Sequence, residues 1–161
     1  MKIQVILPVD RYRAGKIMYG RNSQYHHIDT PWTIQQWYGG HEAPCLGKAD
    51  NAKAKANDNS TRNSLYPWGD TPTGIYAPTH PVWLDKKTQL GEAWIPIIGI
   101  SGDALRAVKN GRTGLGIHAG RGSDKLKPTY GCLRMLAKDF YCMLAYINED
   151  PIDLEITEGN I

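Results

Sequence analysis

The 161-residue chain is poor in cysteine, has no long hydrophobic run and carries little net charge. Its three cysteines, Cys45, Cys132 and Cys142, are too few and odd in number for a disulfide framework, so at least one thiol is free or pairs outside the chain. No stretch approaches the ~20 apolar residues of a membrane-spanning helix. A net charge of +3 is too small to indicate a nucleic-acid binder without a concentrated basic patch.

The first residues also lack the pattern of a signal peptide. The sequence MKIQVILP turns polar at Asp10, and its apolar run is far shorter than the core of an export signal. We therefore expect a cytoplasmic protein, or one delivered to the periplasm by a secretion route that needs no cleaved signal. In the second case a secretion-system or immunity protein would be a partner. Length and composition predict one soluble domain over residues 1–161.

Alternating apolar and polar residues predict strands at both ends of this domain. Residues 2–7 and 16–19, separated by a turn, predict a hairpin, and Ile152, Leu154 and Ile156 predict a closing strand. Residues 94–100 are a further strand candidate, in which Pro96 indicates an edge or a bulge.

Two segments have helical character. Ser101 is a plausible N-cap for a short helix that stops at Asn110 and Gly111. From Leu136 onward a helical period predicts an amphipathic helix, barred from continuing at Pro151, whose apolar face holds Phe140, Met143, Leu144 and Ile147. The predicted fold is mainly β with one or two short α-helices.

The segment from Gly47 to Ser64 reads GKADNAKAKANDNSTRNS and contains no large apolar residue. Without an apolar face to bury, it predicts an exposed polar loop, which at this length is often functional. Its cations, from Lys48 to Lys55, are expected to form a solvated face, or to contact an acidic glycan or cell-wall polymer.

Cys132 and His118 are the strongest candidates for chemistry. They lie 14 positions apart, joined by a glycine-containing loop that can bring an imidazole at a strand end to the thiol. Gly131 allows a tight turn, so the consecutive amides of Tyr130, Gly131 and Cys132 could form an oxyanion hole. The alternative is that Cys132 is a small buried hydrophobe and His118 a structural histidine.

Three motifs resemble the catalytic domain of L,D-transpeptidases, the YkuD-like family. They are Asp70-Thr-Pro-Thr-Gly-Ile-Tyr76, Gly116-Ile-His-Ala-Gly120 and Thr129-Tyr-Gly-Cys-Leu-Arg-Met135, and the resemblance extends from about Tyr66 to Ile156. It implies a mixed β-sandwich, no cofactor and no metal. It also implies a cysteine that cleaves the L,D bond between meso-diaminopimelate and D-alanine in peptidoglycan tetrapeptide stems or muropeptides, through a thioester. If water resolves this thioester, the enzyme is an L,D-carboxypeptidase. If an amine or a D-amino acid resolves it, the enzyme is an L,D-transpeptidase.

The resemblance assigns roles residue by residue. Cys132 matches the nucleophile and His118 the general base. Substrate-binding positions fall at Thr129, Tyr130, Arg134 and Gly120, with Arg134 expected to hold a carboxylate. The chain departs from the family pattern at two positions, where Tyr130 replaces the usual histidine and Ala119 replaces the usual glycine. Its loop between His118 and Cys132 is also shorter than in typical exported members of the family.

Other readings remain open. His26, His27, His41 and Cys45 suggest a zinc site, although no CxxC or HExxH motif accompanies them. The five tryptophans and nine tyrosines could line a saccharide groove, or serve packing alone. The same scaffold could therefore be a noncatalytic cell-wall-binding module, or an interbacterial effector with the same chemistry.

Overall fold

The structure, a computed structural model, describes residues 1–22, 37–88, 90–120 and 124–161. Within these ranges the chain forms nine strands and three helices, so the prediction of a mainly β fold is confirmed. In chain order the elements are β1 (Lys2–Leu7), β2 (Gly15–Asn22), β3 (Trp37–Leu46), α1 (Asn51–Ala56), β4 (Gly74–Pro78), β5 (Val82–Thr88), β6 (Gly91–Ser101), α2 (Gly102–Lys109), β7 (Gly116–His118), β8 (Leu133–Met135), α3 (Ala137–Leu144) and β9 (Asp153–Glu158).

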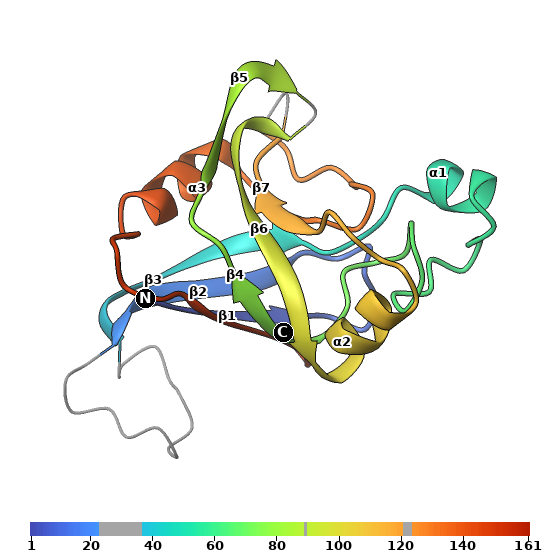
Figure 1. The fold of residues 1–161 in the computed structure, drawn as a ribbon, viewed down its shortest axis with the longest axis horizontal. Coiled ribbons are helices and arrows are strands. Elements are labelled where there is room, and N and C mark those ends of the chain that lie inside the picture. Colours follow the sequence, from blue (N-terminus) through green and yellow to red (C-terminus); the bar gives the residue numbers. More distant parts are fainter. Residues whose placement is uncertain (23–36, 89, 121–123) are drawn as a thin grey trace.

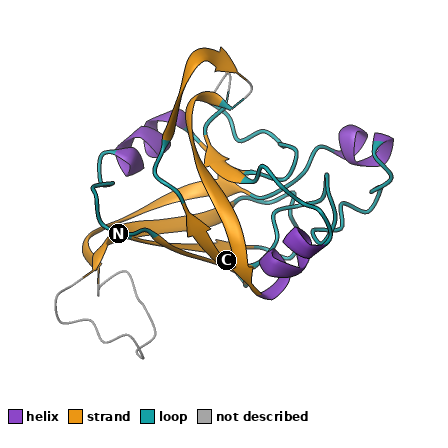
Figure 2. Ribbon diagram, viewed as in Figure 1, coloured by secondary structure: helices purple, strands orange, loops and turns teal. Residues whose placement is uncertain are grey.

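The strands form a closed barrel. They pair in the order β4-β9-β1-β2-β3-β8-β7-β6, and a further pairing between β4 and β6 completes a ring of eight strands. β5 pairs with β6 and rises beyond the ring (Figure 1). The family resemblance implies a mixed β-sandwich, whereas here the pairing runs continuously around the ring. α3 lies on one side of the barrel, and α1 and α2 lie on the other (Figure 2).

The barrel interior is built by the predicted alternation. Ile3, Val5 and Leu7 of β1 have no exposed surface, while the residues between them are partly exposed. β1 pairs antiparallel with β2 and parallel with β9, which confirms the predicted hairpin and closing strand. Burying one face of each strand fixes the register, because a slip of one residue would turn the apolar face outward.

Pro96 lies in an interior strand, so the expectation of an edge is wrong. It faces Gly116 of β7, and its carbonyl accepts a hydrogen bond from the Thr79 amide on the other side. On that other side the partner of β6 changes from β4 to β5, between Pro78 and Val82. The missing N–H of Pro96 therefore falls where the partner strand is interrupted, and no regular ladder bond is lost.

Both predicted helices are present. α2 begins after Ser101 and ends before Asn110 as expected, although the Ser101 side chain makes no capping hydrogen bond. α3 buries Phe140 and Met143 against the barrel but ends at Leu144, earlier than the apolar pattern predicts. None of the helices in the described ranges is long and apolar enough to cross a bilayer.

The segment 47–64 differs from the predicted exposed loop. It contains α1, which Asp50 caps by accepting a hydrogen bond from the Lys53 amide at 2.9 Å. Lys48 and Asn59 are only 4% and 6% exposed. Lys48 donates to the Ala49 carbonyl at 2.9 Å and lies over the Tyr12 ring. The segment is thus ordered by polar and cation–π contacts rather than by an apolar face, which is why its composition does not reveal it.

Candidate functional site

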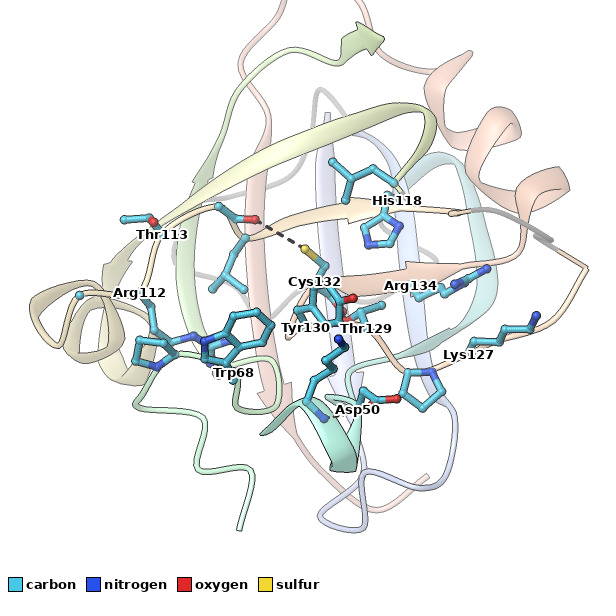
Figure 3. Close-up of a pocket in the computed structure, with 17 residues that line it drawn as sticks. Asp50, Trp68, Arg112, Thr113, His118, Lys127, Thr129, Tyr130, Cys132 and Arg134 are labelled. Atoms are coloured by element: carbon cyan, nitrogen blue, oxygen red, sulfur yellow. Dashed lines mark hydrogen bonds between the residues drawn. The ribbon is translucent and has the colours of Figure 1, made fainter. Parts of the chain in front are cut away.

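A pocket of about 610 Å³ lies beside β7 and β8, and Cys132, His118 and Arg134 all contribute to its lining (Figure 3). β7 and β8 pair in parallel, with Ile117 opposite Leu133 and His118 opposite Arg134. Ile117 and Leu133 belong to the barrel core. Because successive side chains of a strand face opposite sides, His118 and Arg134 point outward from the barrel into the pocket.

Cys132 immediately precedes β8 and is 7% exposed. Its thiol donates a hydrogen bond to the Gly114 carbonyl at 3.6 Å. Burial raises the pKa of this thiol to about 11, although a backbone hydrogen bond from Gly116 and the charge of Arg112 act in the opposite direction. The unliganded protein therefore holds Cys132 as a neutral thiol at physiological pH.

His118 is 4% exposed, and its Nδ1 has no hydrogen-bond partner within the described part of the chain. Burial, together with the charge of the neighbouring Arg134 guanidinium, lowers its pKa to about 4. At neutral pH the imidazole is uncharged and able to accept a proton. The structure thus brings both predicted catalytic residues into one pocket, with the proton still on sulfur.

The turn before Cys132 is fixed by the Thr129 hydroxyl. It accepts a hydrogen bond from the Gly131 amide at 3.0 Å and donates one to the Cys132 carbonyl at 2.8 Å. The Gly131 amide is therefore occupied in this conformation, whereas the predicted oxyanion hole also includes the Tyr130 and Cys132 amides. The hydroxyl of Thr129, predicted to bind substrate, holds this turn, and Thr129 also lines the pocket.

Gly131 is required at this turn by conformation and by space. Its φ of +119° is unfavourable for residues with a side chain. A Cβ there would lie 2.0 Å from an Arg112 nitrogen and 2.7 Å from the Gly69 carbonyl oxygen. The Thr71 hydroxyl donates to the Gly131 carbonyl at 2.7 Å, so the Asp70–Tyr76 motif holds the cysteine turn directly.

Gly120 does not contribute to the pocket lining, contrary to its predicted role in substrate binding. Instead it makes room for Arg134, because a Cβ on Gly120 would lie 2.8 Å from the guanidinium carbon. Arg134 itself is 6% exposed and lines the pocket, as does Tyr130. Arg134 and Tyr130 therefore lie where the sequence analysis predicts contact with substrate.

Arg112 is the main site residue that the sequence analysis does not identify. It is 4% exposed and donates to three backbone carbonyls, those of Ser64 at 2.6 Å, Asp70 at 2.8 Å and Gly69 at 3.0 Å. It thus joins the end of α2 to the segment that leads into Thr71, and it adds positive charge near Cys132. Its only signal in the sequence is its place between the turn glycines Gly111 and Gly114.

The charged residues of the pocket lining are mostly cationic. Among its described residues are Lys53, Arg112, Lys127 and Arg134, against the single carboxylate of Asp50. Asp50 caps α1, and none of the ion pairs found in the described ranges includes Lys53 or Lys127. Such a lining favours a ligand that carries carboxylates.

The zinc alternative gains no support from the residues that can be examined. His41 is exposed, stacks on Tyr19 and contacts the Tyr146 hydroxyl, whereas Cys45 is fully buried in the barrel core. The described part of the chain holds no cluster of three or more metal-binding side chains. His26 and His27 lie outside the described residues.

No protein-family model matches the sequence, and no curated protein matches it. Among solved structures, that of Bd1075 from Bdellovibrio bacteriovorus is similar, with a TM-score of 0.54 and 16% sequence identity. The match covers 96% of this chain and 47% of that protein, so the chain spans about half of its length. At this identity the similarity supports the fold and carries no information on chemistry.

Proposed function

We propose that Cys132 is the nucleophile of an acyl-transfer enzyme that cleaves the L,D bond of peptidoglycan tetrapeptide stems. The observation that carries the proposal is the shared pocket, which is lined both by a neutral imidazole at the end of β7 and by a buried thiol just before the neighbouring strand β8. The substrate class comes from the resemblance of the three sequence motifs to L,D-transpeptidases. The cationic lining fits a stem peptide, whose residues carry several carboxylates.

In the proposed reaction the Cys132 sulfur attacks the carbonyl carbon at the L-centre of meso-diaminopimelate, and the thiol proton passes to His118. Since the resting thiol donates to the Gly114 carbonyl, this step requires that hydrogen bond to break so that the proton can pass to the imidazole. The amides of Tyr130 and Cys132 are the candidates to stabilise the oxyanion. The C–N bond then breaks, and His118 returns the proton to the departing amine of D-alanine.

The resulting thioester has two possible fates. Water yields a tripeptide, which is an L,D-carboxypeptidase outcome. A second amine yields a cross-link or an exchanged D-amino acid, which is an L,D-transpeptidase outcome. Both routes use the same two residues, with His118 now taking a proton from the incoming nucleophile.

Incubating the protein with disaccharide-tetrapeptide, with and without an added D-amino acid, tests the proposal. Mass spectrometry is expected to show loss of D-alanine, and the product mass separates hydrolysis from exchange. Cys132→Ala should abolish turnover, whereas Cys142→Ala, at an exposed thiol outside the pocket, should retain it. A carbapenem should likewise add its mass to the parent protein and not to Cys132→Ala. Absence of both the adduct and D-alanine loss contradicts the proposal.

A noncatalytic cell-wall-binding module is the second candidate. The observation that favours it is the resting state of Cys132, whose pKa is raised to about 11 and whose thiol bonds to Gly114 rather than to His118. Such a module would bind the tetrapeptide without releasing D-alanine. The same incubation, combined with a binding measurement, therefore separates the two candidates.

A further inference from the structure

Two aromatic side chains stand together at the pocket beside the reactive cysteine. The rings of Trp68 and Tyr130 lie with centroids 5.1 Å apart and are tilted by 57°. Both line the pocket, and Tyr130 is 43% exposed. In Figure 3 Trp68 lies on the opposite side of Cys132 from Arg134 and Lys127, and the ring contact places Tyr130 beside Trp68. One half of the pocket thus contains both aromatic rings, with Arg112 beside Trp68, and is called the aromatic half; the other contains Arg134 and Lys127 and is called the cationic half.

The backbone holds Trp68 in an unfavourable conformation. Its φ of +70° lies in the left-handed region, which a bulky side chain rarely adopts. Buried side chains fix the carbonyls on either side of it, Asn59 donating to Pro67 and Arg112 donating to Gly69, each at 3.0 Å. The indole is not part of the hydrophobic core, so core packing does not account for this conformation. Strain maintained in this way is typical of a binding or catalytic site.

The chemistry of the aromatic half suits a sugar ring. A pyranose presents a face of C–H groups that packs on an aromatic ring, while its hydroxyls reach polar tips such as the indole N–H and the phenol O–H. The cationic half suits carboxylates. A ligand that satisfies both halves carries a sugar at one end and an anionic peptide at the other.

We propose that Trp68 and Tyr130 form a carbohydrate-stacking subsite, which selects stem peptides that still carry their sugar over free peptides. This inference rests on the proposed function, because it takes the peptide cleaved at Cys132 as the other part of the ligand. It also gives Tyr130 a role at the position where the resembling family usually has histidine.

Calorimetric titration of Cys132→Ala with disaccharide-tetrapeptide and with free tetrapeptide tests the subsite without turnover. We expect the glycan-bearing ligand to bind about tenfold more tightly, as one well-packed aromatic contact would give. Adding Trp68→Asn should reduce the ratio to near one, and asparagine tolerates the left-handed backbone at this position. The matched control is Trp83→Asn, at a tryptophan that is 64% exposed and does not line the pocket; it should leave the ratio unchanged.

Tyr130→Leu provides a second variant in case Trp68→Asn perturbs the loop, and it too should reduce the ratio. Equal affinity for the two ligands in Cys132→Ala overturns the subsite, as does an equal loss of affinity for both ligands in the aromatic variants. The two proposals fail separately. Turnover of both peptides with equal kcat/KM would support the proposed enzyme activity and contradict the subsite. Glycan-dependent binding without any turnover would support the subsite and contradict the enzyme activity.

Discussion

Acidification should destabilise this protein in a window set by His118. Burial lowers the pKa of the folded imidazole from its ordinary 6.5 to about 4. Between these values the unfolded chain binds a proton that the folded chain does not, so stability falls as the pH falls from 6.5 to 4 and this loss is absent above 6.5. Each pKa unit corresponds to about 1.4 kcal/mol, which gives a loss of about 3 kcal/mol for a side chain that is 4% exposed.

Urea unfolding of the parent and of His118→Gln, at several pH values from 7.5 to 4, measures this loss. Carboxylates titrate in both proteins and cancel in the difference between them. We expect the free energy of unfolding of the parent, relative to His118→Gln, to decrease by about 3 kcal/mol across the window. A difference that stays constant, or that increases as the pH falls, would refute the conclusion that burial keeps His118 neutral.

Three substitutions test how the site is held, each read out by urea unfolding. Gly131→Ala should cost at least about 2 kcal/mol, because alanine is strained at a φ of +119° and meets the Arg112 guanidinium. Arg112→Lys keeps the charge but not the three carbonyl contacts and should cost about 3 kcal/mol, whereas Arg106→Lys on an exposed face should change stability by less than about 0.5 kcal/mol. Thr129→Val removes both hydroxyl contacts and should cost about 2 kcal/mol, which Thr129→Ser should largely restore. If a variant has the same free energy of unfolding as the protein it is compared with, the contact assigned to that residue does not stabilise the fold.

The barrel interior is the part of the fold that the sequence predicts well. Alternation in β1 and β9 follows directly from burying one face of a strand, and the buried side chains are those that the pattern selects. Pro96 is an exception to the rule that proline in a strand indicates an edge or a bulge. Its tolerance depends on β4 ending and β5 beginning opposite it, which is a property of two other strands. The structural preference of proline alone cannot predict where two other strands end and begin.

The segment 47–64 is mispredicted for a different reason. Hydrophobic patterns reveal segments that are buried by apolar contact, whereas Lys48 and Asn59 are buried with their polar groups satisfied. Asn59 donates to two carbonyls that lie four and eight residues away. The contribution of such a side chain to the stability of the segment depends on the conformation of the loop. Amino-acid composition alone therefore cannot predict this contribution.

Cys132 and His118 can be singled out in the sequence because they are reactive residue types beside glycines and lie in motifs that resemble those of L,D-transpeptidases. Arg112 cannot be found in this way, since its three partners lie 42 to 48 residues away. Trp68 is equally hidden, because its left-handed backbone is imposed by the contacts of its neighbours. The residues that support the site are therefore visible only once the fold brings distant segments together.

The location of the pocket explains why its residues are buried at all. His118 and Arg134 lie on the outer face of the barrel, opposite the core positions Ile117 and Leu133, and strand alternation alone would leave them in solvent. Both are nevertheless almost fully buried beside the pocket, and Arg112 and Thr129, which also line it, hold its loops through hydrogen bonds to backbone groups. Burial is the largest cause of the shifted pKa values of both His118 and Cys132. The chemistry of the site thus depends on polar contacts outside the barrel as much as on the apolar core within it.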